Sequence, residues 1–132
     1  MAKLFFRYSA MNAGKSTSLL QIAYNYEEQG QTVLLFTAGI DDRSGHGRIA
    51  SRLGLQRDAQ VFDAQTDFWA LLHSQTQLAC VLIDESQFLT PEQVRQLHRV
   101  AHTVGIPTIC FGLRSDFQGC LLYTSDAADE RP

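Results

Sequence analysis

The chain has little of what marks secreted, membrane-bound or nucleic-acid-binding proteins. It has three cysteines in 132 residues, too few and too scattered for a disulfide framework or a zinc site. Its net charge is −3 and no basic run occurs, which argues against a nucleic-acid partner. No apolar stretch approaches the ~18 residues of a membrane span, and the first residues lack a signal-peptide pattern. These absences predict a cytoplasmic protein without a membrane or nucleic-acid partner.

What is present is the composition of one ordinary globular domain. Hydrophobic residues make up 45% and charged residues 19% of the chain, a normal soluble balance. At 132 residues the chain is long enough for one domain with a modest core. Cys80 and Cys110 lie inside apolar, strand-like runs, where a thiol behaves as a small buried hydrophobe.

Apolar runs and helical patterns alternate along the chain. The expected elements are, in order, strand 4–9, helix 15–28, strand 32–37, helix 66–75, strand 78–84, helix 90–104 and strand 106–113. Residues 38–57 lack a long apolar run, which predicts a surface loop with a short helix at 49–53, before a short strand at 61–62. This alternation predicts an α/β fold with a mostly parallel sheet and helices on both faces. Such sheets bind ligands at the carboxyl ends of their strands.

The helix expected at 90–104 carries three agreeing start signals. Thr90 is a favoured N-cap residue, Pro91 occupies the first helical position, and Gln93 stands three residues after the cap, as in a capping box. Gly30 and Gly105 each follow a helical pattern and predict where those two helices end.

Residues 9–16 join the first strand to the first helix and read Ser-Ala-Met-Asn-Ala-Gly-Lys-Ser. A small-residue loop followed by Gly-Lys-Ser and a helix is the phosphate cradle of P-loop nucleotide enzymes. In such a loop, backbone N–H groups and the helix N-terminus hold the β-phosphate, Lys15 reaches the β- and γ-phosphates, and the Ser16 hydroxyl is a Mg²⁺ ligand. The predicted nucleotide-binding residues are Ser9, Ala10, Met11, Asn12, Ala13, Gly14, Lys15 and Ser16.

One position departs from that motif, because Ser9 stands where the pattern has glycine. The order of strand, loop and helix therefore supports the prediction of a nucleotide site more strongly than the residue types of the motif do. The alternative interpretation is an ordinary glycine-containing turn.

A second motif follows the strand expected at 78–84, which ends in Asp84 and Glu85. In P-loop proteins an Asp at this place holds Mg²⁺ beside the nucleotide phosphates. Glu85 lies one residue further, so it points differently and is available for proton transfer. If Glu85 aligns a water molecule, the protein is an ATPase; if it accepts a proton from a substrate hydroxyl, the protein is a kinase. The alternative is that Asp84 caps a turn and Glu85 is solvated.

Segments 8–17, 41–43, 84–89 and 112–117 together resemble the thymidine kinases of the bacterial and cytosolic (type II) family. The resemblance runs in order through residues 1–119. It implies a P-loop NTPase core of the RecA-like type that transfers the γ-phosphoryl group of ATP to the 5′-hydroxyl of thymidine. That transferase reaction belongs to nucleotide salvage and supplies DNA synthesis. Ser9 at the first loop position also occurs in the members that this chain resembles.

The resemblance also implies a role for each matching residue. Glu85 is the general base, and Ser16 and Asp84 serve Mg²⁺. Further residues on the ATP side are Arg43 and Gln87, of which Arg43 neutralises transition-state charge. The positions that match the nucleoside pocket are Met11, Phe88, Leu113 and Phe117.

The residues themselves leave some of these assignments open. Phe88 and Leu113 can equally pack in the core. An aromatic residue shortly after the acidic pair offers a face for a pyrimidine, which favours a kinase over an ATPase. A P-loop ATPase and a non-catalytic nucleotide-binding module are the alternative functions.

Residues 120–130 read Cys-Leu-Leu-Tyr-Thr-Ser-Asp-Ala-Ala-Asp-Glu and depart from the resemblance. They resemble the translation of a sequencing adapter read through in frame; the alternative is a genuine divergent tail. The expected division is therefore a nucleotide-binding domain at 1–119 and an artefactual tail at 120–132. In the family a zinc-ribbon and lasso segment follows the core, and the assembly is a homotetramer. Because the zinc ligands and the lasso have no counterpart here, the 132-residue chain is expected to be truncated and nearly inactive.

Overall fold

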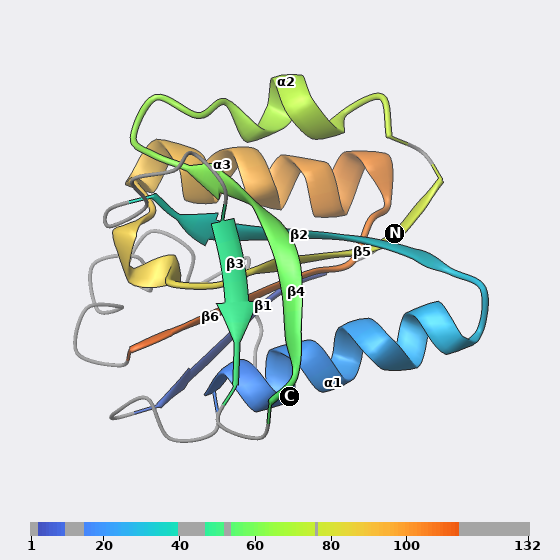
Figure 1. Ribbon diagram of the computed structural model, residues 1–132. Coiled ribbons are helices and arrows are strands. Elements are labelled where there is room, and N and C mark those ends of the chain that lie inside the picture. The colour runs from blue at the N-terminus through green and yellow to red at the C-terminus, as the bar shows by residue number, and fades with distance from the viewer. Residues whose placement is uncertain (1–2, 10–14, 40–46, 52–53, 76, 114–132) are drawn as a thin grey trace.

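The computed structural model describes residues 3–9, 15–39, 47–51, 54–75 and 77–113 (Figure 1). Within these ranges the chain forms one sheet covered by helices. The elements are β1 (Leu4–Ser9), α1 (Lys15–Glu28), β2 (Thr32–Ala38), β3 (Gly47–Ala50), β4 (Gln56–Phe62), α2 (Phe68–Leu72), β5 (Leu78–Ile83), the 3-10 turn η1 (Ser86–Phe88), α3 (Pro91–Arg99), the π-helical segment η2 (Val100–Val104) and β6 (Thr108–Leu113). No helix of the described part is long and apolar enough to cross a membrane.

The described strands lie in the order β1-β6-β5-β2-β4-β3, and every neighbouring pair is parallel except β3 with β4. The path from β1 through α1 to β2 crosses the sheet in one direction. The path from β4 through α2, β5 and α3 to β6 returns in the other. Because such crossovers are right-handed, α1 covers one face and α2 and α3 cover the other (Figure 1). The predicted fold class is confirmed.

Each face of the sheet buries its own apolar core. Leu4, Phe6, Phe36, Val81 and Ile83 pack on the side of α2 and α3. The side of α1 buries Leu19, Leu20, Leu35, Cys80 and Leu82. Successive residues of β5 thus enter opposite cores, as the pleat of a strand requires. A strand buried on both faces is apolar throughout, which is why β5 was recognisable in the sequence.

The two described cysteines, Cys80 and Cys110, are buried thiols, as their apolar surroundings predicted. Burial raises the pKa of the Cys80 thiol to about 12, although its hydrogen bond with Tyr26 acts in the opposite direction. Cys80 is therefore a protonated, packed side chain at neutral pH.

The segment between β2 and α2 differs from the prediction. Residues 47–62 were expected to hold a loop, a short helix at 49–53 and a strand of two residues, but Ile49 lies in β3 and β4 has seven residues. In β3, buried Gly47 and Ile49 alternate with exposed residues. β4 carries polar side chains at most positions, since only one of its faces is covered. A half-covered strand shows period-2 alternation and no apolar run, and that signal was missed.

The remaining element boundaries differ by a few residues. Helix α2 has five residues and is shorter than the expected range 66–75. The helix expected at 90–104 is α-helical to Arg99 and continues as a π-helical segment. Gly30 and Gly105 have φ angles of 78° and 90° and end their helices as predicted.

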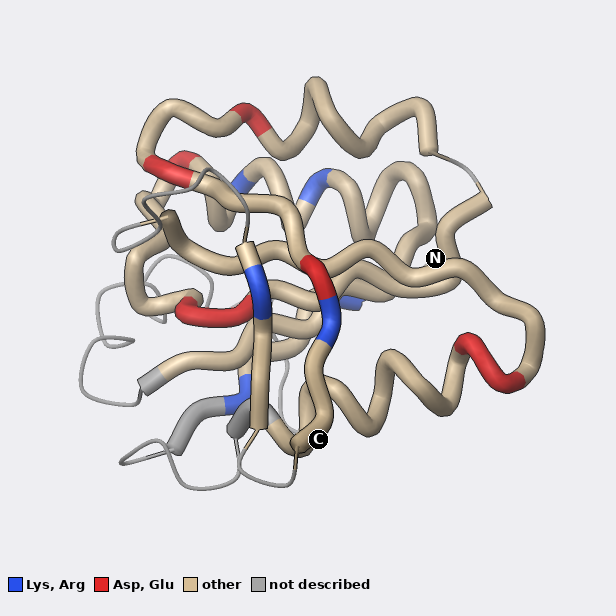
Figure 2. Tube along the Cα trace, viewed as in Figure 1, with Lys and Arg blue, Asp and Glu red and all other residues tan. Residues whose placement is uncertain are grey.

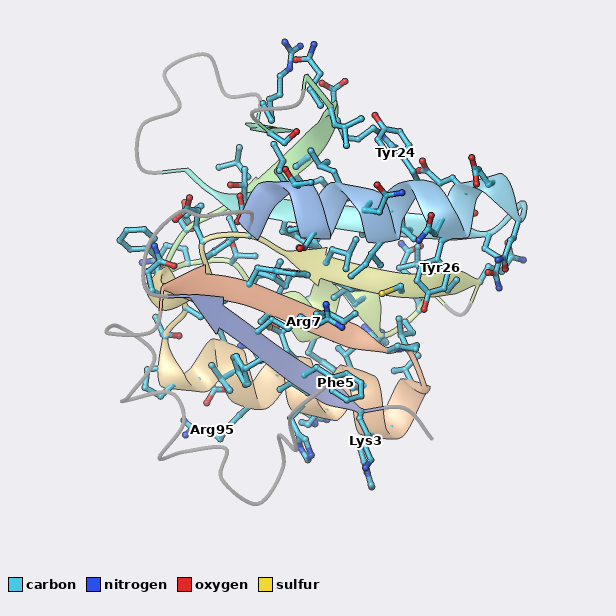
Figure 3. All side chains as sticks on the ribbon, turned by 90° about the horizontal axis from the view of Figure 1, so that it is seen from below. Lys3, Phe5, Arg7, Tyr24, Tyr26 and Arg95 are labelled. Atoms are coloured by element: carbon cyan, nitrogen blue, oxygen red, sulfur yellow. The ribbon has the colours of Figure 1, made fainter. Side chains whose placement is uncertain are left out.

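The β3–β4 hairpin is attached to α1 by polar side chains. The Tyr24 hydroxyl donates to the carbonyl of Gln56 (3.1 Å), and Arg57 forms an ion pair with Glu27. The Arg57 guanidinium also lies over the Tyr24 ring, 5.6 Å from its centroid. Figure 3 shows Tyr24 and Tyr26 extending from different sides of α1. Tyr24 makes the contact with the hairpin, whereas Tyr26 faces Cys80.

Candidate active site

The functional motifs meet at the carboxyl edge of the parallel strands. Ser9 is the register partner of Leu113, and Ile83 that of Cys110, so β1, β6 and β5 end side by side. Phe36 pairs with Ile83, which brings the end of β2 to the same edge. The carboxyl ends of these four strands therefore lie at one edge of the sheet, as the sequence predicted.

Helix α1 begins at Lys15, directly after the segment that leaves β1. A helix N-terminus offers unpaired backbone N–H groups and a partial positive charge, which suits a phosphate. β1 ends at Ser9 and α1 begins at Lys15, inside the Gly-Lys-Ser motif, so the strand and the helix lie where the motif requires them. Among the predicted residues of this loop, Ala10, Met11, Asn12, Ala13 and Gly14 lie outside the described residues.

Asp84 is a buried carboxylate at the end of β5, with only 5% of its surface exposed. Its backbone N–H donates to the carbonyl of Phe36 (2.8 Å), which extends the β5–β2 pairing by one residue. A carboxylate is kept out of water in a protein only where polar or cationic partners compensate it. Figure 2 shows this acidic segment at the edge where the strands end.

The carboxylate available at this edge is a suitable ligand for Mg²⁺. No group of three or more His, Cys, Asp or Glu side chains that could hold a metal is present among the described residues. Mg²⁺ at nucleotide sites does not need such a cage, because it keeps several waters and uses one or two carboxylates with the substrate phosphates. A single buried carboxylate, Asp84, at the edge where the Gly-Lys-Ser motif begins α1 satisfies that requirement.

Glu85 has a left-handed backbone, with φ 59° and ψ 42°. It is the one non-glycine residue with a positive φ in the described ranges. This conformation costs roughly 1–2 kcal/mol for a residue with a side chain, so the surrounding structure must hold it. β5 ends at Ile83, Asp84 continues its pairing, and Glu85 directly precedes the 3-10 turn η1.

Hydrogen bonds within the turn hold Glu85 in place. The Ser86 hydroxyl donates to the carbonyl of Ile83 (3.1 Å), and the N–H of Phe88 donates to the carbonyl of Glu85 (3.1 Å). The side-chain amide of Gln87 donates from Nε2 to Glu85 Oε1 (2.7 Å). The carboxylate of Glu85 is thus oriented by a neighbour and remains only partly buried.

Phe88 is exposed at the same edge. Its exposed fraction is 47%, which excludes the alternative that it is core packing. Leu113 ends β6 beside Ser9. Arg43 and Phe117 lie outside the described residues.

Gly112 lies in the motif at 112–117, but the sequence pattern predicted no role for it. In the structure, a Cβ atom at Gly112 would lie 2.8 Å from Gln87 Oε1 and 3.1 Å from the Gln87 backbone nitrogen. A glycine inside an apolar strand often marks such a close approach, and this signal was available in the sequence.

A mostly parallel sheet with Gly-Lys-Ser after one strand and Asp-Glu after a nearby strand is the arrangement of the P-loop class of α/β proteins. The family model described as thymidine kinase matches residues 2–126. The chain belongs to the thymidine kinase family.

Three bacterial relatives of the chain carry the name thymidine kinase. The chain is 63% identical over 119 residues to the thymidine kinase of Chromobacterium violaceum, a match that covers 90% of this chain and 64% of that relative. It is 53% identical over 122 residues to the thymidine kinase of Photobacterium profundum, with the same two coverages. For the thymidine kinase of Shewanella oneidensis the identity is 54% over 128 residues, 95% of this chain and 67% of the relative. The chain thus spans about two thirds of the length of these relatives.

Proposed function

We propose that this family member transfers the γ-phosphoryl group of ATP to the 5′-hydroxyl of thymidine, giving thymidine monophosphate and ADP. The observation that supports the proposal best is the Asp84–Glu85 pair, one buried and one held by Gln87, at the sheet edge where the Gly-Lys-Ser segment begins α1. The relatives are named thymidine kinase, and we take thymidine as the proposed substrate from these names.

On the ATP side, the start of α1 and the loop 9–16 bind the phosphates. Lys15 balances the charge of the β- and γ-phosphates, and Arg43 neutralises the charge that develops during transfer. Asp84 and Ser16 are the residues that would hold Mg²⁺, and Gln87 also faces the nucleotide. Bound there, Mg²⁺ would supply positive charge that offsets the charge of the phosphates.

Glu85 acts as the general base. A carboxylate removes a proton efficiently only when it lies within hydrogen-bond reach of the hydroxyl in a fixed direction. The left-handed backbone and the 2.7 Å bond from Gln87 supply that direction. Because the γ-phosphate lies beside the Gly-Lys-Ser segment, a hydroxyl that contacts Glu85 is in position to attack it.

On the nucleoside side, the exposed Phe88 offers a face for the pyrimidine ring. Met11, Leu113 and Phe117 are proposed to complete the pocket. Phe88 follows β5 and Leu113 ends β6, at the edge that also holds Glu85, whereas Met11 and Phe117 follow β1 and β6 in the sequence.

The test is the isosteric substitution Glu85→Gln. Two forms are assayed: the 132-residue chain, and a chimera in which the C-terminal third of the Chromobacterium violaceum relative follows residue 119. In the active form, Glu85→Gln should lower kcat for thymidine phosphorylation by about 100-fold or more while leaving the affinity for a fluorescent ATP analogue unchanged. Unaltered kcat in Glu85→Gln would contradict the proposed role.

A further inference from the structure

Gly112 occupies a place where glycine is unfavourable without a special reason. It lies in β6, where it pairs with Tyr8 and follows the buried residues Cys110 and Phe111. Glycine in a strand interior loses more conformational entropy on folding than other residues do. Its φ is not in the left-handed region, so backbone conformation does not require glycine here. The reason must be the space beside it.

That space is filled by η1. A Cβ at Gly112 would lie 2.8 Å from Gln87 Oε1, 3.1 Å from the Gln87 backbone nitrogen and 3.3 Å from the Ser86 backbone nitrogen. Two of these three atoms belong to the backbone, so a side chain at this position displaces the turn itself.

The third atom, Gln87 Oε1, belongs to a side chain that is itself held. The nitrogen of the same amide, Nε2, donates to Glu85 Oε1 over 2.7 Å. If the amide turns away from position 112, this hydrogen bond is lost or lengthened. The absence of a side chain at Gly112 therefore affects the position of the Glu85 carboxylate, and it does so through the amide group of Gln87.

The other side of the turn gives little room for adjustment. Ser86 is fully buried and donates to the carbonyl of Ile83, and Leu89 donates its N–H to the carbonyl of Ser86 (3.0 Å). Glu85 is already in a strained backbone conformation. A side chain added at position 112 of β6 therefore displaces Gln87 and Glu85, because the neighbouring residues of the turn are held in place.

We propose that Gly112 is a positioning residue for Glu85, acting through the turn and the side-chain amide of Gln87. This inference rests on the proposed function, because it makes Gly112 matter for catalysis only if Glu85 is the base. Gly112 contacts neither ATP nor thymidine in this mechanism. It contributes because its lack of a side chain leaves space for the turn η1.

The first test is the kinetic effect of Gly112→Ala in the form that phosphorylates thymidine. A displacement of a catalytic group by less than ~1 Å should lower kcat by about 10- to 100-fold. The change in KM for ATP, toward which Gln87 is also proposed to lie, should be clearly smaller than the change in kcat. Gly105→Ala is the matched control. It places alanine at a φ of 90° with nothing within 4 Å, in the segment between η2 and β6, and so costs stability without touching η1. Equal kcat in the two variants at a similar loss of Tm would overturn the proposal.

A double-mutant cycle tests the route through the amide. Gln87→Met keeps the length of the side chain and removes the donor. If Gly112 acts through this group, the losses of kcat in Gly112→Ala and Gln87→Met should combine to clearly less than their product. Losses that multiply would show that Gly112 does not act through Gln87, and would overturn the proposal.

An NMR measurement does not depend on activity. The side-chain amide signals of Gln87 are assigned by their absence in Gln87→Met and should shift in Glu85→Gln. They should also shift in Gly112→Ala and not in Gly105→Ala; unchanged signals in Gly112→Ala would overturn the proposal. If no form phosphorylates thymidine, the proposed function fails, and the NMR result still decides whether Gly112 sets the Gln87–Glu85 contact.

Discussion

The backbone N–H of Asp84 donates to the carbonyl of Phe36 over 2.8 Å, which continues the pairing of β5 with β2 for one residue beyond the strand. The next residue, Glu85, leaves the sheet in a left-handed conformation. Two consecutive carboxylates thus stand in different surroundings, one buried in the sheet edge and one in a turn. This difference is the structural basis for giving them separate roles.

The first prediction concerns Asp84→Asn, which keeps the backbone pairing and the side-chain shape but removes the charge. We expect the Mg²⁺ concentration for half-maximal activity to rise by about tenfold or more, since the metal loses an anionic partner. Activity is titrated with Mg²⁺ at fixed ATP. Asp58→Asn is the control, because Asp58 is exposed on β4, and the proposed metal role does not survive if both variants keep the same Mg²⁺ dependence.

The second prediction uses two exposed side chains of similar exposure. Phe88 is 47% exposed and Leu71 is 44% exposed. If Phe88 stacks on the pyrimidine, Phe88→Ala should raise KM for thymidine by about tenfold or more, because base–aromatic stacking contributes ~1–3 kcal/mol. Leu71→Ala on α2 should leave KM unchanged. Steady-state kinetics at saturating ATP measures both, and an equal KM in the two variants would exclude Phe88 from the pocket.

The third prediction concerns the capping box of α3. Thr90 Oγ1 accepts from the Gln93 N–H (3.1 Å), and Gln93 Oε1 accepts from the Thr90 N–H (3.0 Å). Gln93 is 1% exposed, and its Nε2 also donates to the carbonyls of Asp63 (2.7 Å) and Thr66 (3.0 Å). Gln93 thus fastens the segment before α2 to the start of α3.

Removing the two residues should therefore have unequal effects. Thr90→Ala should lower the free energy of unfolding by about 1 kcal/mol, as for other lost N-caps. Gln93→Ala should lower it by about 2–4 kcal/mol, because it leaves several buried groups without partners. Urea unfolding at equilibrium measures both values; similar losses would mean that the bonds from Gln93 to Asp63 and Thr66 contribute nothing.

The fourth prediction concerns pH. Burial, and next the nearby His102, lower the pKa of His98 below its ordinary value of 6.5, and the two rings stack with centroids 5.6 Å apart. The unfolded chain then binds a proton at His98 more readily than the folded chain does. The free energy of unfolding should be fully retained above about pH 6.5 and fall as the pH drops from there through the lower folded-state pKa.

Urea unfolding at about pH 7.5 and about pH 5.5 measures this loss. His98→Gln should remove the contribution of His98, and His102→Gln should reduce it by taking away the second cause. A pH dependence that is identical in His98→Gln and the unmodified chain would contradict this assignment.

Much of the fold was predictable because its central strands are buried on both faces. The strand 4–9 and the helix 15–28 were predicted with the bounds that the structure has. The start of α3 was predictable because its capping signals are local. The β3–β4 hairpin was not, since half-covered strands alternate polar and apolar residues and β4 resembles a loop in composition.

The candidate site also has features that the sequence predicted and features that it did not. Asp84 and Glu85 follow an apolar strand, so their place at the sheet edge could be read from local sequence. Gly112 inside an apolar strand signals a close approach, but that Gln87 makes this approach, and that Glu85 is left-handed, depends on how β6 packs against η1. The roles of the site residues, including Met11, Arg43 and Phe117, and the boundary at residue 119 remain predictions.

The central claim is that Glu85 activates a nucleoside hydroxyl and not a water molecule. The most direct measurement is the rate of ADP formation from ATP with and without thymidine, in the 132-residue chain and in the chimera. We predict that thymidine raises the rate by about tenfold or more in the active form, with one thymidine monophosphate formed for each ADP. ADP formation at the same rate without any nucleoside would contradict the claim and identify an ATPase.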